Sequence, residues 1–484
     1  MTPTRLRILA FCGVLIAIFL PHLTDFNYGF GSYEMVAITI GCLITGSILG
    51  AAFRNQLLFG FALGYLVYFF IDSYFLEPQW GLACLVVTFL LTPVLVRQMP
   101  YGVPLAVSVF GFVFGFPSFF ATSDPMLVTR AAAVEVAATD RPDFAYLHII
   151  LDEQLSPIVD HPTMPRVAGR EEVIDTYLDH GFLLYGRADS EAQQTFEAVS
   201  SIFGLTADIT NYVEQPEPDP YFYHVADNRL VQRLLDSGFA PTVIGSDYLR
   251  LCGDDPRVTC HRYTMQDMMS GAALLGWQPL KRLQYALITI DNDFKWGSRR
   301  VLGYRGYAFH LARLAGWRDE PHQPIMPPLT NLTILEDLST SVADLAPGDA
   351  LIAHLLVPHR PFLFDRDCNF KEIADWRYPL YPERTEIDAS AYEAFWDQSI
   401  CTHRRLADLF QAIEGRSDLV VIVHGDHGSR ILSGTSLSTH VDSRATFLAV
   451  RAPGFAPGLE SSTVPLQATF AEIFQSVFPP VQGN

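Results

Sequence analysis

The run DLVVIVHGDHG, residues 418–428, combines an apolar strand pattern with a group of polar side chains at its end. Its first half is rich in β-branched residues, which is typical of a strand buried on both faces. The strand ends in His424, Asp426 and His427, and the glycines beside them let the backbone turn sharply. The run therefore predicts a buried parallel strand whose carboxyl end carries polar side chains.

Similar short apolar runs recur along the second part of the chain, with helical patterns between them. The runs are 145–151, 240–245, 350–357 and 446–453, and the helical patterns are 171–179, 191–203, 228–237, 332–345, 390–414 and 467–477. Strands that alternate with helices predict an α/β fold, a doubly wound and mostly parallel sheet with helices on both faces. Ligands of such sheets bind beyond the carboxyl ends of the strands.

Polar side chains stand at the ends of three of these predicted strands. Acidic residues follow the first run, and histidines lie within and just past the run 350–357. Carboxylates and imidazoles together suit zinc or manganese, and they leave open whether one or two ions bind. The candidate ligands are Asp152, Glu153, His354, His359, Asp426 and His427.

The first part of the chain has the composition of a membrane domain. Of the 484 residues, 49% are hydrophobic and 18% charged. Five apolar stretches cover residues 6–23, 35–53, 56–75, 80–97 and 101–121, and each has about the ~20 residues that a membrane-spanning helix needs. We expect a five-helix transmembrane bundle at 1–121, a connector at 122–142 and an extracytoplasmic catalytic domain at 143–484.

The few charges of the first part predict its orientation. Arginines lie at the N-terminus and in the second and fourth loops, at Arg5, Arg7, Arg54 and Arg97, whereas the first and third loops carry only acids. This positive-inside pattern predicts a cytoplasmic N-terminus and an external second part. The net charge of −19 falls entirely on residues 122–484, which argues against binding to nucleic acid.

The cysteines agree with an oxidising compartment. Three of the seven, Cys12, Cys42 and Cys84, lie within apolar stretches, and four lie in the second part. An even number there predicts two disulfides, most simply Cys252–Cys260 and Cys368–Cys401. The other pairings and a structural zinc site remain as alternatives.

Three motifs resemble those of the alkaline phosphatase superfamily, and specifically of its membrane-anchored sulfatase-like branch. They are HIILDE at 148–153, HGDHG at 424–428 and His359-Arg360-Pro361. The branch includes phosphoethanolamine transferases, phosphoglycerol transferases and lipoteichoic acid synthases. Its members combine five N-terminal spans, a connector and an external α/β domain, which is the organisation expected here for nearly the whole chain.

The resemblance assigns roles to individual residues. Asp152 matches the first metal ligand, with Glu153 as second choice, and Asp426 with His427 matches the later ligand pair. The nucleophile is expected 40–45 residues after the first ligand, where Thr195 begins a helical pattern. A hydroxyl there lies near free backbone N–H groups.

Further residues follow from the same resemblance. Ser190 is the alternative nucleophile, and Ser200 and Ser201 lie too far into the predicted helix. His359, His440 and Arg444, with His354, are expected to bind the phosphoryl group or a second metal.

The function implied is metal-dependent transfer of a phosphoethanolamine or phosphoglycerol group through a phospho-Thr intermediate. A membrane phospholipid would be the donor, and a cell-envelope glycan or lipid the acceptor. The expected location is a bacterial-type inner membrane, with several spans and a periplasmic catalytic domain. The segment after Thr195 has neither the Pro nor the Arg of the sulfatase C/S-x-P-x-R signature, which disfavours sulfate-ester hydrolysis. The alternatives are a membrane-tethered phosphatase or phosphodiesterase and a non-catalytic sensor or scaffold; the oligomeric state is not indicated.

Overall fold

The computed structural model divides the chain into two compact units, Met1–Pro125 with Gln266–Ile325 and Met126–Met265 with Met326–Asn484. It describes residues 2–25, 33–75, 81–119, 142–160, 166–214, 223–246, 248–253, 255–263, 283, 327–371, 389–431 and 440–479. Nearly all of the expected connector 122–142 lies outside these residues.

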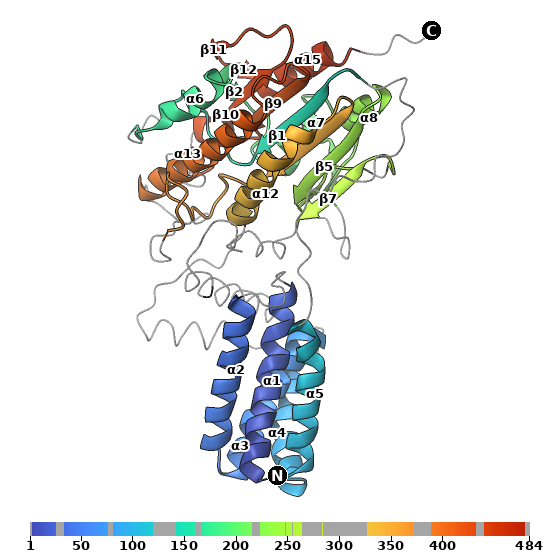
Figure 1. The fold of residues 1–484 in the computed structure, drawn as a ribbon, viewed down its shortest axis with the longest axis vertical. Helices are drawn as coiled ribbons and strands as arrows, with labels where there is room; N and C mark the ends of the chain where they lie inside the picture. The colour runs from blue at the N-terminus through green and yellow to red at the C-terminus, as the bar shows by residue number, and fades with distance from the viewer. Residues whose placement is uncertain are drawn as a thin grey trace. The chain divides into compact units, whose positions relative to one another are not determined.

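The first unit contains a bundle of apolar helices (Figure 1). They are α1 (Pro3–Asp25), α2 (Tyr33–Ala52), α3 (Gln56–Phe75), α4 (Gly81–Gln98) and α5 (Gly102–Phe119). Helix α1 packs against α2, α3 and α5, and α3 packs against α4. Small residues bring the backbones together: a Cβ on Gly111 would lie 2.3 Å from the carbonyl oxygen of Gly13. Such close glycine contacts are typical of helices packed in membranes.

Two helical segments of this unit, Pro3–Pro21 and Tyr33–Ala52, are long and apolar enough to cross a membrane. Among the described residues the other three helices contain shorter apolar segments, Gln56–Tyr68, Val87–Gln98 and Gly102–Val113. A full set of five crossings therefore stays a prediction.

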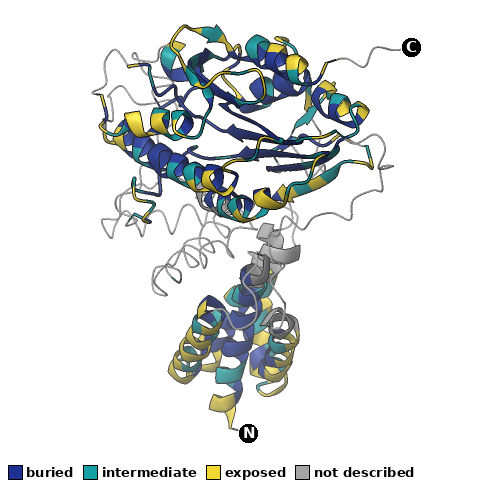
Figure 2. Ribbon diagram, turned by 45° about the horizontal axis from the view of Figure 1, so that its top comes forward, coloured by how far each residue is buried: buried dark blue, intermediate teal, exposed yellow. Residues whose placement is uncertain are grey.

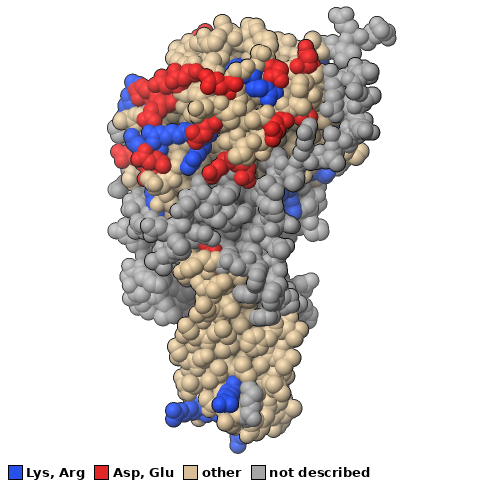
Figure 3. Space-filling model, viewed as in Figure 1, with Lys and Arg blue, Asp and Glu red and all other residues tan. Residues whose placement is uncertain are grey.

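Basic residues gather at one end of the bundle. The guanidinium of Arg7 donates hydrogen bonds to the carbonyls of Phe53 and Arg54, at 2.8 and 2.9 Å. Arg7 therefore lies beside the loop that carries Arg54. Figure 3 shows basic side chains at the end of the bundle that carries the N-terminus and an uncharged surface above them. This distribution is the one that the positive-inside rule predicts for a cytoplasmic end.

A large sheet forms the centre of the second unit. Within the described residues its order is β11–β2–β10–β9–β1–β8–β5–β7, with β12 paired to β2. All neighbouring strands are parallel except β10, which is antiparallel to both β9 and β2. The strands are β1 (Ala145–Leu151), β2 (Leu183–Asp189), β5 (Ala240–Ser246), β7 (Thr259–Tyr263), β8 (Asp349–Leu355), β9 (Leu419–Gly425), β10 (Ala445–Arg451), β11 (Gly458–Glu460) and β12 (Val464–Pro465). The predicted mostly parallel sheet is confirmed.

Helices cover both faces of this sheet, and Figure 2 shows the buried strands between two helical layers. One layer holds α7 (Thr195–Phe203), α8 (Arg229–Asp236) and α15 (Leu466–Val477), which share an apolar core with the strands. The other layer holds α6 (Arg170–Leu178), α12 (Pro327–Ser341) and α13 (Ala389–Ala412). There the ring of Tyr177 on α6 contacts Phe410 of α13 and Phe447 of β10. Remaining elements are the 3₁₀ turn Val342–Asp344, α14 (His440–Arg444) and a small sheet of β3 (Tyr212–Glu214), β4 (Tyr223–Val225) and β6 (Leu249–Arg250).

The sequence pattern missed part of this topology. Strand β2 was not expected, because its residues LLYGRAD include a glycine and two charges and do not form a continuous apolar run like those of the expected strands. The run 446–453 does form a strand, but β10 is antiparallel, since it pairs with β2 and β9 by backbone contacts that no local pattern records. Helix α7 begins at Thr195 and is shorter than the expected 191–203.

Candidate active site

The acidic residues converge because their strands are neighbours in register. Leu151 of β1 pairs with Gly425 of β9, so the residues that follow them, Asp152 and Asp426, leave the sheet at the same level. The amide of Asp426 donates to the carbonyl of Leu151 at 3.2 Å. Only glycine fits at 425, since a Cβ there would lie 2.0 Å from the hydroxyl oxygen of Thr446.

Thr195 reaches this point from the first turn of α7. Its hydroxyl donates to the Asp152 carboxylate, with distances of 3.4 Å to Oδ1 and 3.3 Å to Oδ2. The same oxygen lies 3.3 Å from Nε2 of His427. All three side chains are buried. The structure thus brings the predicted nucleophile to the predicted metal ligands.

The donor atoms around Thr195 fit a divalent cation. Nδ1 of His427 bonds to the carbonyl of Gly428 at 2.8 Å, so the proton resides there and Nε2 offers its lone pair. Oδ1 of Asp426 accepts from the amides of Glu153 and His427, at 3.0 and 2.7 Å. Its buried Oδ2 has no hydrogen-bond partner in the described part of the chain. Ligand atoms of Asp152, Asp426 and His427 lie within 4.8 Å of one another.

Electrostatics support the same interpretation. Burial, followed by repulsion from Asp426, raises the pKa of Asp152 to about 8. Burial raises the pKa of Asp426 to about 7. Burial lowers the pKa of His427 well below its ordinary value, which keeps the imidazole neutral and able to ligate. Two crowded carboxylates beside a neutral imidazole form a set whose ionised state a bound cation would stabilise.

We expect Asp152 and Asp426 to contribute less to the stability of the metal-free protein as the pH rises from about 4 to about 8. The unfolded chain releases the protons of Asp152 and Asp426 near pH 3.8, whereas the folded chain keeps them to about pH 8 and about pH 7. At these two carboxyls the folded state therefore binds more protons in this interval, and their contribution to stability falls with pH. Buried histidines such as His148 and His424, whose pKa burial lowers, act in the opposite direction, so the carboxyl contribution has to be isolated with a variant. Thermal unfolding of the metal-free wild type and of metal-free Asp426→Asn at pH 5 and pH 8 does this, and the wild type should lose stability relative to the variant toward pH 8. A wild type that gains stability relative to the variant toward pH 8 would contradict the prediction.

Glu153 forms an ion pair that the sequence did not predict. Its carboxylate is buried and pairs with Arg430, whose Nε lies 2.9 Å from Oε1. Although burial opposes ionisation, His359 and Arg430 hold the pKa of Glu153 below its ordinary range. Glu153 also belongs to a second group that could hold a metal, with Asp152 and His359. The only sequence signal of Arg430 is its position two residues after the HGDHG run.

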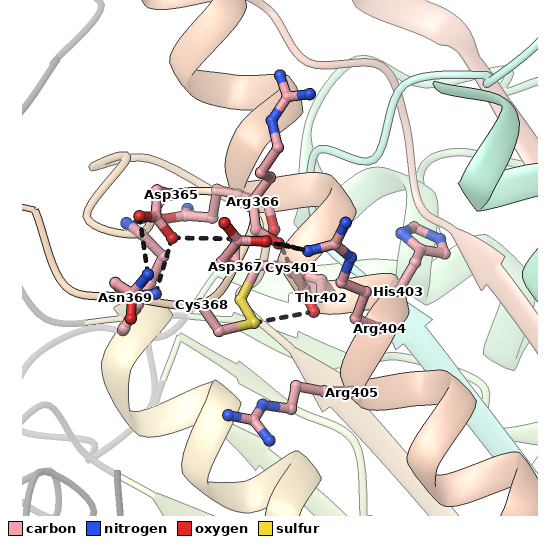
Figure 4. The surroundings of a disulfide bond; sticks show 12 residues. Asp365, Arg366, Asp367, Cys368, Asn369, Cys401, Thr402, His403, Arg404 and Arg405 are labelled. Carbon is pink, nitrogen blue, oxygen red and sulfur yellow. Dashed lines mark hydrogen bonds and ion pairs between the residues drawn. A yellow bond between two sulfur atoms is a disulfide. The ribbon is translucent and has the colours of Figure 1, made fainter. Parts of the chain in front are cut away.

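The segment that carries His359 is attached to α13. The buried amide of Gln398 accepts from the amide of Leu363 at 2.8 Å and donates to the carbonyls of Pro358 and His359, both at 3.0 Å. The disulfide Cys368–Cys401 ties the same segment to the helix (Figure 4). The disulfide Cys252–Cys260 is also present, so both preferred pairings are confirmed. Cys12 and Cys42 are free and buried, and the side chain of Cys84 lies outside the described residues.

Loss of the disulfide Cys368–Cys401 is expected to cost about 3–4 kcal/mol of unfolding free energy, because the bond closes a loop with a sequence separation of 33. The double variant Cys368→Ser/Cys401→Ser tests this by denaturant unfolding. The matched variant Cys252→Ser/Cys260→Ser opens a loop with a separation of only 8 and should cost less, about 2.5 kcal/mol. Equal losses in the two variants would contradict the loop-closure account.

The remaining predicted residues take different places. Nε2 of buried His354 lies 3.8 Å from Oδ2 of Asp152. His440 is exposed and bonds to Asp189 at 3.1 Å, and the carbonyl of Arg444 accepts from the amide of Ser190. These contacts hold His440 and Arg444 against the end of β2, and their role in binding phosphate stays a prediction. The hydroxyl of Ser190 instead bonds to Gln467 of α15, at 3.0 Å.

No protein-family model matches the chain, and no curated protein matches it in sequence. Solved structures do show similar folds. One is the phosphonate monoester hydrolase of Agrobacterium radiobacter, with 13% identity, a TM-score of 0.39, and coverage of 69% of this chain and 72% of that one. Another is the zinc complex of the C-terminal periplasmic domain of EcEptC from Escherichia coli, with 11% identity, a TM-score of 0.37, and coverage of 70% and 82%.

A third similar structure is a protein in the alkaline phosphatase superfamily from Vibrio parahaemolyticus, with 9% identity, a TM-score of 0.33, and coverage of 72% of each chain. At such low identities and TM-scores, the chemistry of this chain has to be inferred from its own side chains.

Proposed function

We propose that the protein is a metal-dependent phosphoryl-group transferase that works through a phospho-Thr intermediate. One observation carries the proposal: a threonine hydroxyl at a helix N-terminus lies 3.3 Å from both a carboxylate oxygen and an imidazole nitrogen of a buried, metal-compatible group. Helix capping does not explain the position of this hydroxyl, because the N-cap residue of α7 is Gln194 and Thr195 follows it.

Asp152, Asp426 and His427, with the hydroxyl of Thr195, would hold the cation, which is zinc or manganese because oxygen and nitrogen ligands are mixed. A cation bound there lowers the pKa of the hydroxyl and screens the charge of the phosphoryl oxygens. Glu153 and His359 are the residues available for a second ion or for the substrate.

The phosphoryl group is transferred in two steps. The oxygen of Thr195 attacks phosphorus, the bond from phosphorus to the diacylglycerol oxygen breaks, and that oxygen takes up a proton. Asp152 accepts the hydrogen bond of the hydroxyl and can hold its proton during the attack. In the second step an acceptor hydroxyl attacks the phospho-Thr and restores the free threonine. Backbone N–H groups of the first turn of α7, and His359, face the charged oxygens in this scheme.

A membrane location is part of this proposal. We propose that all five cross a bacterial-type inner membrane and hold the catalytic unit on the periplasmic side. The donor is a phospholipid with a phosphoethanolamine or phosphoglycerol head group, and the acceptor is a cell-envelope glycan or lipid. Anchoring the enzyme in the membrane of its donor raises the effective concentration of that donor.

The experiment uses the full chain in vesicles of phosphatidylethanolamine and phosphatidylglycerol with labelled head groups, zinc, and a glycolipid acceptor. We expect diacylglycerol, a labelled acceptor and a labelled Thr195 after acid quenching. Release of free head-group phosphate without a labelled acceptor would identify the second candidate, a tethered phosphodiesterase with water as acceptor. No turnover with any donor would favour a sensor or scaffold and contradict the proposal.

A further inference from the structure

A buried ion pair joins the loop after β9 to the end of β1. The side chains of Arg430 and Glu153 are 9% and 1% exposed. Nε and Nη2 of the guanidinium both donate to Oε1 of the carboxylate. Oε2 is buried and has no hydrogen-bond partner among the described residues. The two donors of this rigid, planar group fix the orientation of the carboxylate through one oxygen and leave the other oxygen available.

The other end of the same guanidinium holds the residues before the nucleophile. Nη1 of Arg430 donates to Oε1 of Gln194 at 2.7 Å and to the carbonyl of Gln193 at 3.3 Å. Gln194 is the N-cap residue of α7, and its side chain makes no capping hydrogen bond. The side chain that could have capped the helix is instead used by Arg430. One arginine therefore links the end of β1 to the residue directly before Thr195.

Both residues of the ion pair have a strained backbone conformation. Glu153 and Arg430 have φ angles of 61° and 52°, in the left-handed region that L-residues rarely adopt. Such conformations persist where the surrounding structure enforces them, and they concentrate at functional sites. Here the left-handed Glu153 also directs its amide to Oδ1 of Asp426 at 3.0 Å. Glu153 thus donates its backbone amide to Asp426 of the metal group and accepts hydrogen bonds from Arg430 with its side chain.

We infer that Arg430 is a positioning residue that fixes Thr195 through Gln194, while the other end of its guanidinium orients Glu153. The inference rests on the proposed function and adds to it the residue that sets the direction of the nucleophile. Arg430 acts through Gln194 and does not itself touch the reacting atoms. Its loss should therefore lower kcat more than it changes KM or metal affinity.

The test compares two variants of the zinc-loaded full chain. Gln194→Ala removes the acceptor of Arg430 at an exposed position, so folding is not threatened. Arg430→Lys keeps a cation beside Glu153, but a single ammonium cannot hold both carboxylate and amide. Each should lower kcat by about 10- to 100-fold, as expected for a misplaced reacting group, with KM and zinc affinity close to those of the wild type. The melting temperature should stay close to that of the wild type in Gln194→Ala and fall in Arg430→Lys, which weakens a buried ion pair. Glu191→Ala, an exposed residue in the same loop, is the matched control and should leave kcat unchanged.

A third variant separates the two contacts of Arg430. Glu153→Gln keeps an oxygen for Arg430 and leaves the contact with Gln194 in place, so kcat at saturating zinc should stay well above that of Arg430→Lys. A kcat as low as that of Arg430→Lys would mean that Arg430 acts through the charge of Glu153 and would overturn the inference. Wild-type kcat in both Gln194→Ala and Arg430→Lys would also overturn it. If the wild type binds zinc and forms phospho-Thr, and these variants have the same kcat as the wild type, the inference alone is refuted. If the wild type forms no phospho-Thr, the proposed function and the inference are refuted together.

Discussion

Replacing Thr195 with alanine should abolish labelling of the protein and lower the rate of phosphoryl transfer by at least about 10³-fold, since loss of a covalent nucleophile has effects of this size or larger. The methyl group that remains cannot attack phosphorus, and Asp152 loses the hydroxyl that it accepts from. Zinc affinity should fall less than activity, because Asp152, Asp426 and His427 remain. The measurement is the rate of diacylglycerol release from labelled vesicles, with zinc binding followed by calorimetry.

Two control variants sharpen this prediction. Thr195→Ser keeps the hydroxyl and should keep both the phosphorylated intermediate and most of the rate. Ser190→Ala removes the alternative nucleophile, whose hydroxyl bonds to Gln467, and should leave the intermediate in place. If labelling survives in Thr195→Ala and disappears in Ser190→Ala, the nucleophile has been assigned to the wrong residue.

Asp426→Asn should weaken zinc binding by more than about 100-fold. Mutation of residues that only hydrogen-bond to metal ligands typically lowers metal affinity by roughly 10- to 100-fold, and loss of a ligand should cost more. Oδ1 of Asp426 is fixed by two backbone amides, so the amide group of asparagine would occupy the position of Oδ2. That position lies 3.3 Å from Nε2 of His427, and an N–H₂ group there offers no lone pair. Activity should fall with occupancy and recover in part at high zinc concentration.

The matched control is Asp397→Asn. Asp397 lies on α13, and its Oδ1 pairs with Nη2 of Arg366 at 2.9 Å. This variant should bind zinc as the wild type does. If Asp426→Asn binds zinc as tightly as the wild type and His359→Ala binds it more weakly, the metal site is instead the second group of Asp152, Glu153 and His359. Either result is read directly from a zinc titration and does not depend on the identity of the substrate.

Sequence alone predicted the features that depend on local pattern. Apolar runs of strand length between helical patterns predicted a sheet covered on both faces, and the carboxyl ends of parallel strands had to meet at one edge. Asp152 and Asp426 follow neighbouring strands in register, so their convergence was a consequence of the topology. Both disulfide pairs were likewise predicted from spacing and compartment.

Only the tertiary structure decided which polar side chains face these acids. Thr195 and Ser190 stand five residues apart, and packing of α7 turns the first toward Asp152 while the second bonds to α15. Arg430 and Glu153 are 277 residues apart, and their pairing requires left-handed turns that no composition rule specifies. Strand and helix periodicity is set by neighbours in the chain, whereas a side-chain contact depends on the positions of two separate elements, which are fixed only when the core is packed.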